Sequence, residues 1–213
     1  MNPSDVPFPT PSSTVREFPW QTLYGVNLRC IELLVHAARS ERPDTLPLVR
    51  ELRDQFRNTD PESRQRASER GALLVDIAFQ DEDWWHGVKV DPVRKRRTIG
   101  SLGFARRTAV PLARAALTLA WYGIQEDAET ATVVLGMSRG VTEVIAQLQL
   151  PEIDRLAECR YRQLLPRWHD QPDYWRDLLE GSRSSAPASE RRLNLRAVQM
   201  VVGEQLSLRT ASR

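Results

Sequence analysis

The segment LGMSRGVTEVIAQLQLPEIDRLA, residues 135–157, decides how the second half of this chain folds. Gly136 suits the left-handed residue that ends a helix, and Ser138 can begin the next helix by accepting a backbone N–H near Val141. The inner apolar stripe of that second helix consists of Val141, Val144, Ile145 and Leu148. The pattern predicts two helices joined by a tight turn.

The other side of this second helix is polar and is predicted to face solvent or a partner. Its candidate DNA-contacting residues are Arg139, Thr142, Glu143 and Gln147. This is the layout of a helix-turn-helix, whose second helix enters the major groove. The turn is one residue shorter than in the usual motif, and Thr132 stands where alanine is preferred. A DNA-reading element and a purely structural hairpin therefore both stay open at this point.

The bulk composition is that of an ordinary globular protein. The chain has 213 residues, of which 41% are hydrophobic and 27% charged, and its formal net charge of +2 gives no global signal for nucleic acid. Cys30 and Cys159 lie far apart, which predicts two reduced thiols rather than a disulfide framework or a metal site. The first residues lack signal-peptide features, and no apolar run is long enough to span a bilayer, so a cytoplasmic protein is predicted.

The first half is predicted to be helical as well. Residues 1–18 are rich in Pro and Ser and are predicted to form a flexible arm. Helices are predicted over residues 26–38, 45–56 and 60–71, the last of them capped by Asp60 and closed by Gly71. The short apolar run ALLVDIAF that follows fits either a buried strand or a buried helical turn.

Turn-forming Gly and Pro residues between positions 80 and 103 predict a boundary between two subdomains. The predicted units are residues 19–92, an N-terminal helical subdomain, and residues 93–180, a second helical domain that is helical throughout from about residue 105. Residues 181–213 are predicted to be a linker and an amphipathic tail.

Residues 119–157 resemble, without a gap, the D subunit of the bacterial flagellar master transcriptional regulator, the FlhD family. The short turn is that family's own spacing, and the likeness extends over residues 105–180 at its widest. The shared residues are Leu119, Ala120, Ile124, Asp127, Ala131, Leu135, Gly136, Ile145, Ala146, Leu148, Leu150, Pro151, Leu156, Ala157 and Glu158.

The resemblance implies a helical, dimerising subunit of a transcription factor that acts with a second subunit and binds promoter DNA poorly alone. It implies that residues 112–123, including Leu112 and Leu119, supply the dimer interface, and that residues 139–149 face DNA. The long N-terminal half and the C-terminal extension depart from the family. Control of flagella, of secretion or of conjugative transfer would fit equally well.

The densest basic cluster directly precedes the FlhD-like region. It comprises Arg94, Lys95, Arg96 and Arg97, followed by Arg106 and Arg107. Such a cluster attracts DNA phosphates whatever the base sequence, because neutralising them releases counterions. The alternative is a solvated loop, or pairing with the acidic stretch just upstream.

Aromatic residues provide candidate partner anchors. Trp84 and Trp85 follow an acidic stretch and suit a protein interface or packing within the core. Trp168 and Trp175 lie among arginines and suit a protein interface, stacking on unpaired bases or packing within the core. The acidic residues beside His86 lack the spacing of a metal site. No catalytic residue and no cofactor is predicted.

The sequence thus predicts a mainly α-helical protein that acts as a DNA-binding subunit of an oligomeric transcriptional regulator. The alternative is a helical adaptor that binds proteins and never touches DNA.

Overall fold

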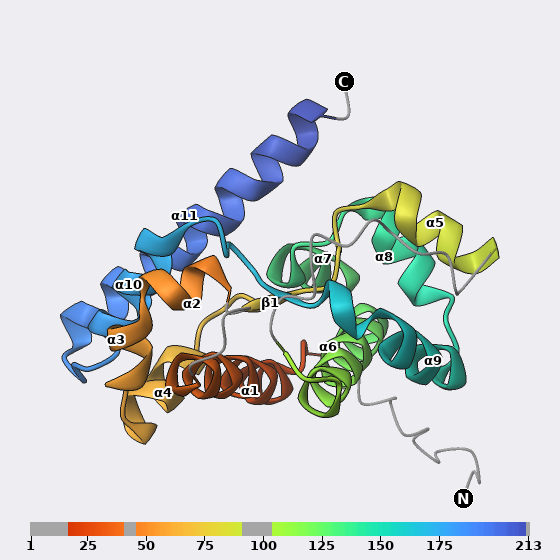
Figure 1. The fold of residues 1–213 in the computed structure, drawn as a ribbon. Coiled ribbons are helices and arrows are strands. Elements are labelled where there is room, and N and C mark those ends of the chain that lie inside the picture. Colours follow the sequence, from red (N-terminus) through yellow and green to blue (C-terminus); the bar gives the residue numbers. More distant parts are fainter. Residues whose placement is uncertain (1–16, 41–45, 91–103, 212–213) are drawn as a thin grey trace, which may run out of the picture.

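The computed structural model describes residues 17–40, 46–90 and 104–211, and this part of the chain is mainly α-helical (Figure 1). The predicted fold class is therefore confirmed. Most of the predicted arm and the basic residues from Arg94 to Arg97 lie outside the described ranges. No helix within those ranges has both the length and the apolar character that a bilayer crossing requires.

Four helices form the N-terminal part: α1 (Trp20–Arg39), α2 (Pro47–Glu51), α3 (Arg53–Arg57) and α4 (Pro61–Ser68). The single helix predicted over residues 45–56 is wrong in detail, because the backbone breaks at Leu52 (φ −103°, ψ 28°) and separates α2 from α3. The break allows Leu48, Leu52 and Phe56 all to be buried against the core.

The predicted start of α4 is confirmed. The Asp60 carboxylate accepts a hydrogen bond from the Ser63 N–H at 2.9 Å, and Pro61 occupies the first turn. The predicted end is wrong, since α4 stops at Ser68 and Gly71 does not adopt a left-handed conformation.

The run over residues 72–79 is mostly irregular. Only β1 (Val75–Asp76) is extended, and it pairs antiparallel with β2 (Leu165–Pro166). Asn27 holds this buried backbone: its side-chain oxygen accepts from the Leu74 N–H at 2.8 Å, and its amide donates to the Ala72 carbonyl at 2.9 Å. A side chain on α1 thus replaces the partners that a helix or a wider sheet would provide.

The C-terminal part contains α5 (Glu82–Val90), α6 (Arg106–Glu126), α7 (Ala128–Leu135), α8 (Arg139–Ala146), α9 (Leu150–Arg160), α10 (Pro172–Gly181) and α11 (Pro187–Ala211). The prediction of helix throughout residues 105–180 fails after α9. A 3₁₀ turn (Tyr161–Gln163) and β2 follow there, and Pro166 has no N–H with which to continue a helix. In Figure 1, the C-terminal half of α11 projects from the body.

The two predicted subdomains share one buried core. Helix α6 packs against α1 as well as against α7, α8 and α9. Phe18, at the end of the predicted arm, is 4% exposed and lies against Gly123, where an added Cβ would come within 2.7 Å of its ring. Phe18 therefore belongs to the packed core, although it was predicted to be the last residue of the flexible arm.

The two cysteines are free. Cys30 is buried, and its burial raises the pKa of the thiol to about 12, whereas Cys159 is exposed.

Candidate functional site

Helices α6, α7 and α8 form a three-helix unit around the predicted turn. The α6 side chain of Trp121 donates from Nε1 to the carbonyl of Leu148, just after α8, at 2.8 Å. Asp127 ends α6 and caps α7, accepting from the Thr130 N–H at 3.0 Å. This is the arrangement on which a helix-turn-helix is built.

The turn between α7 and α8 has the predicted geometry. Gly136 is left-handed (φ 70°, ψ 34°), and the Ser138 hydroxyl accepts from the Val141 N–H at 3.2 Å. A Cβ on Gly136 would lie 2.2 Å from the guanidinium of Arg167, so glycine is needed there for space as well as for conformation. The Ser138 N–H donates to the carbonyl of Phe79 at 3.0 Å and ties the turn to the segment before α5.

Helix α8 has a buried face and an exposed face. The predicted inner stripe is buried, as the exposures of Val141 (0%) and Ile145 (0%) show. On the opposite side, Arg139, Glu143 and Gln147 are exposed. The Arg139 side chain is 93% exposed and forms an ion pair with Glu143 at 3.3 Å.

Thr142 does not belong to this exposed face, contrary to the prediction. It is 9% exposed, its hydroxyl lies 3.0 Å from that of Thr132 on α7, and it donates to the Ser138 carbonyl at 3.0 Å. The residue that departs from the usual motif, Thr132, is thus the one that covers Thr142.

An acidic side chain occupies the N-terminal end of α8. Glu82, at the start of α5, accepts from the Gly140 N–H at 3.1 Å, and a Cβ on Gly140 would lie 2.6 Å from its carboxyl carbon. Hydrogen bonds from the Ser138 side chain and the Gly140 N–H hold the pKa of Glu82 below its usual value, so it is ionised at neutral pH. This carboxylate stabilises α8 through the helix dipole and repels other anions.

The predicted partner anchors lie inside the chain's own core. The buried residues of this set, with their exposures, are Trp84 (6%), Trp85 (1%), Leu112 (1%), Leu119 (1%), Trp168 (9%) and Trp175 (0%). Two indole groups show why. Trp85 donates to the Ala78 carbonyl at 2.9 Å and Trp175 to that of Arg167 at 3.0 Å, so both the apolar ring and the polar N–H find partners inside. None of the six is free to bind a partner.

The remaining basic candidates are exposed and lie on another helix. Arg106 and Arg107 lie at the start of α6, where Arg106 pairs with Glu158. Arg106 precedes Trp121 by 15 residues of α6, or about 22 Å of helix, and Trp121 is one of the α6 residues that contact the C-terminal end of α8.

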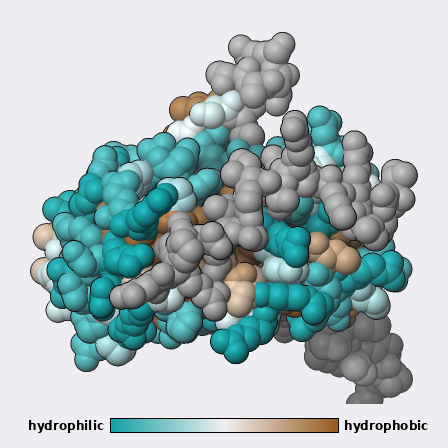
Figure 2. Space-filling model, viewed as in Figure 1, coloured by the Kyte–Doolittle hydropathy of each residue, from teal (hydrophilic) through white to brown (hydrophobic). Residues whose placement is uncertain are grey.

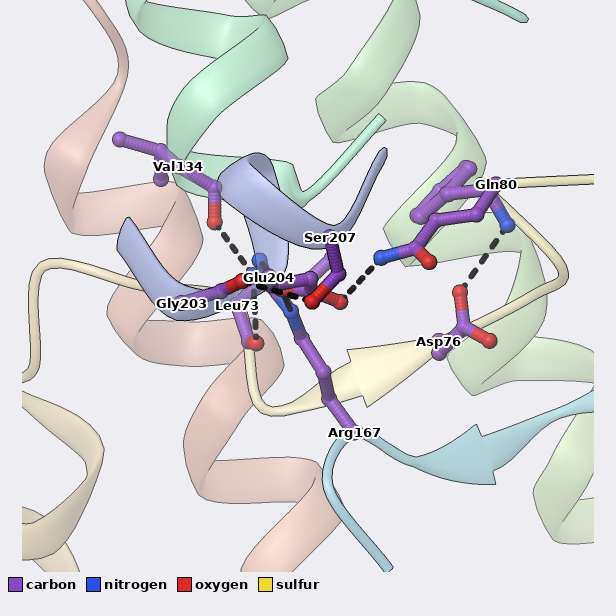
Figure 3. A network of polar contacts seen from close by, with 9 residues as sticks. Leu73, Asp76, Gln80, Val134, Arg167, Gly203, Glu204 and Ser207 are labelled. Carbon is purple, nitrogen blue, oxygen red and sulfur yellow. Dashed lines mark hydrogen bonds and ion pairs between the residues drawn. The ribbon is translucent and has the colours of Figure 1, made fainter. Parts of the chain in front are cut away.

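Arg167 is the main polar group that the sequence did not reveal (Figure 3). It is 3% exposed, and its guanidinium donates to the carbonyl of Val134 at 2.8 Å and, from Nε, to the Glu204 carboxylate at 2.9 Å. Gln80 donates to the same carboxylate. These contacts join β2, α7 and α11, and no local sequence pattern predicts them.

A groove of about 1120 Å³ lies beside α11. Its opposite wall includes Asp81, Glu82, Asp83 and Asp170. In the part of the chain that the structure describes, no three or more His, Cys, Asp or Glu side chains are placed so that they could hold a metal ion. Asp81 instead caps α5, accepting from the Trp84 N–H at 3.0 Å.

Comparison of the chain with protein-family models, with curated proteins and with solved structures found no match.

Proposed function

We propose that this protein is a DNA-binding subunit of a transcriptional regulator and that it contacts DNA through the exposed face of α8. One observation carries the proposal: a three-helix unit with a capped, left-handed turn presents Arg139, Glu143 and Gln147 to solvent on a helix whose other face is buried. That is the geometry with which a recognition helix enters a major groove. The resemblance to the FlhD family supports the same function.

Arg139 is suited to contact either a phosphate or a base edge. Its side chain is 93% exposed, and its partner Glu143 is 64% exposed, so water screens the ion pair and little is lost when it opens. The guanidinium fork can then bond a phosphate or a guanine bidentately.

The acidic side chains near α8 limit the affinity of the chain alone. Glu82 and Glu143 are both exposed carboxylates close to Arg139, and each repels phosphate. Tight binding then needs a second subunit that supplies further phosphate contacts. This is the expectation that the FlhD resemblance carries.

The test is crosslinked immunoprecipitation of the tagged full chain from its own host, followed by sequencing of the bound DNA. Sharp enrichment at a few promoters is expected, with most of it lost in the double variant Arg139→Ala/Gln147→Ala. The matched control is Arg29→Ala/Gln21→Ala, which removes the same two side-chain types from the exposed face of α1. A flat profile for the unaltered protein when it is abundant would overturn the proposal.

A protein-binding adaptor is the second candidate, and the acidic surroundings of α8 favour it. If Arg139 docks on a protein, the immunoprecipitate contains a partner whose recovery falls in the Arg139→Ala/Gln147→Ala variant while the DNA profile stays flat. The two functions therefore give opposite results in the two fractions of one experiment.

A further inference from the structure

Helix α11 has apolar side chains on two opposite faces. On the inner face, Leu193 (4% exposed) and Val201 (7%) pack against the body, and Glu204 bonds Arg167. The outer face carries Leu195 (60% exposed), Val198 (58%), Val202 (50%) and Leu206 (57%). Seven large hydrophobic side chains are exposed in the described residues, and four of the seven lie on this one helix.

The four outer residues form a narrow stripe, which we call the α11 stripe. At about 100° per residue, their spacing of three, four and four positions confines them to about 80° of the helix, opposite the inner face. In Figure 2, brown atoms lie on the projecting part of α11 beside the grey C-terminal residues. A stripe this narrow suits the seam between two helices, whereas a membrane-surface helix presents a broader apolar face.

A basic residue and an acidic wall lie on one flank of the α11 stripe. Arg191 and Arg192 are exposed just before the stripe. Further along α11, Gln199, Gly203 and Ser207 line the groove whose far wall includes Asp81, Asp83 and Asp170. Arg192 lies 7 positions before Gln199 and 11 before Gly203, so helical periodicity places all three on the same flank of α11.

We propose that the α11 stripe binds the same stripe of a second copy of this chain in antiparallel orientation. Leu195 of each copy then lies opposite Leu206 of the other, and Val198 lies beside Val202. A two-fold axis perpendicular to the plane of the two helices places the Arg192-bearing flanks of both copies on the same side of the dimer. The arginine of each copy thereby comes beside the acidic wall of the other, as a closed, self-complementary interface requires.

A parallel pair would not bring Arg192 of one copy to the acidic wall of the other, because it places Arg191 and Arg192 of the two copies side by side. Residues 112–123, where the resemblance implies a dimer interface, cannot serve through Leu112 and Leu119, because both are 1% exposed in the chain's own core. The dimer does not depend on DNA binding, although it would present two copies of α8 to a two-fold symmetric operator.

The apolar part of the interface is tested by the mass of the full chain in sedimentation-equilibrium centrifugation across a range of concentrations. A reversible dimer is expected, and Val202→Asp is expected to weaken it at least about tenfold. The matched control is Val133→Asp, the same change at an exposed valine of α7, which should leave the dimer intact. A monomer at every concentration, or a dimer indifferent to Val202→Asp, would overturn the proposal.

The antiparallel orientation is tested by charge exchange. Arg192→Glu and Asp83→Arg should each weaken self-association, because each places like charges together. A mixture of the two variants should restore the dimer, since both contacts then join opposite charges. Failure of the mixture to associate would overturn the orientation. Circular dichroism of each variant separates loss of the dimer from loss of the fold. Binding of anionic lipid vesicles by a monomer, lost in Val202→Asp, would assign the stripe to a membrane surface instead.

Discussion

Helices α8 and α11 both present a face to solvent, and the two faces differ in kind. Helix α8 buries one apolar stripe and exposes Arg139, Glu143 and Gln147, so its hydrophobic side is fully used within the chain. Helix α11 buries one apolar stripe and exposes a second of similar length. An amphipathic helix needs one apolar partner, whereas a helix that is apolar on two sides needs two.

This difference separates the two kinds of partner that each helix can have. The polar face of α8 can pair with the polar edges of bases or with charged groups on a protein. The α11 stripe can be stabilised only by removal from water. Each face can bind a partner only if the contacts on the inner side of its helix hold that helix in place.

The largest expected effect concerns the anchor of α11. Arg167→Ala removes the buried guanidinium that bonds the Glu204 carboxylate and the carbonyls of Leu73 and Val134, and should lower the free energy of unfolding by about 3–5 kcal/mol. Urea denaturation followed by circular dichroism measures it.

The control for this change is Arg176→Ala on α10. Arg176 is partly exposed and pairs with Glu51 and Asp173, so its loss should cost less than about 1 kcal/mol. An equal loss of unfolding free energy in Arg167→Ala and Arg176→Ala would mean that the inner face of α11 is held by apolar packing alone.

The next effect concerns the turn before α8. Gly136→Ala forces a left-handed alanine against the guanidinium of Arg167, and should destabilise the fold by roughly 2–4 kcal/mol. Thermal unfolding detects the loss.

Gly25→Ala is the matched change with the opposite expected sign. Gly25 lies within α1 with no atom near its Cβ position, so alanine should stabilise the protein by up to about 1 kcal/mol. A harmless Gly136→Ala would mean that the turn tolerates other geometries and is not a fixed element.

A smaller effect should follow from the charge beside α8. Glu82→Gln removes one carboxylate from the end of that helix, and should tighten binding to a mixed-sequence DNA duplex by about two- to fivefold at low salt, less at high salt. Fluorescence anisotropy of a labelled duplex measures the change.

Glu62→Gln on α4 provides the control, because it removes the same charge from an exposed carboxylate on another helix. The same gain in both variants would show that net charge alone governs the interaction.

The smallest effect concerns acid sensitivity. Hydrogen bonds from Ser63 and Thr130, from their side chains first, hold the pKa values of the capping carboxylates Asp60 and Asp127 below their usual range. Because the folded pKa is the lower one, the stabilisation is present above the unfolded value of about 3.9 and is lost as the pH falls through the folded pKa.

The double variant Asp60→Asn/Asp127→Asn keeps the capping oxygens without the charge. Its urea midpoint should lie slightly below that of the unaltered protein at neutral pH, and the difference should disappear in strong acid. A constant difference at every pH would show that the caps act without their charge.

The sequence predicted those parts of the molecule whose contacts are local. Ser138 and Asp60 each cap a helix by accepting from the backbone N–H three positions further along the chain. Residue type and spacing were therefore sufficient to predict both caps. The buried stripe of α8 likewise follows from its period.

The errors arose where burial depends on residues distant in the chain. Thr142 is covered by Thr132, on the preceding helix. Trp84 and Trp85 resembled surface anchors because their local neighbours are acidic, whereas their packing partners include Arg160 and Phe79. The α11 stripe cannot be distinguished from the inner stripe until the fold shows which of the two faces the body.

The network around Arg167 also bears on the order in which the chain folds. Its guanidinium meets Leu73, Val134 and Glu204, which lie 94, 33 and 37 residues away along the chain. Helices of this length form in about a microsecond or less, but contacts of such long range require large loops to close first. The slow step of folding is therefore expected to be the joining of β1, β2 and α11 around Arg167, after the helices themselves have formed.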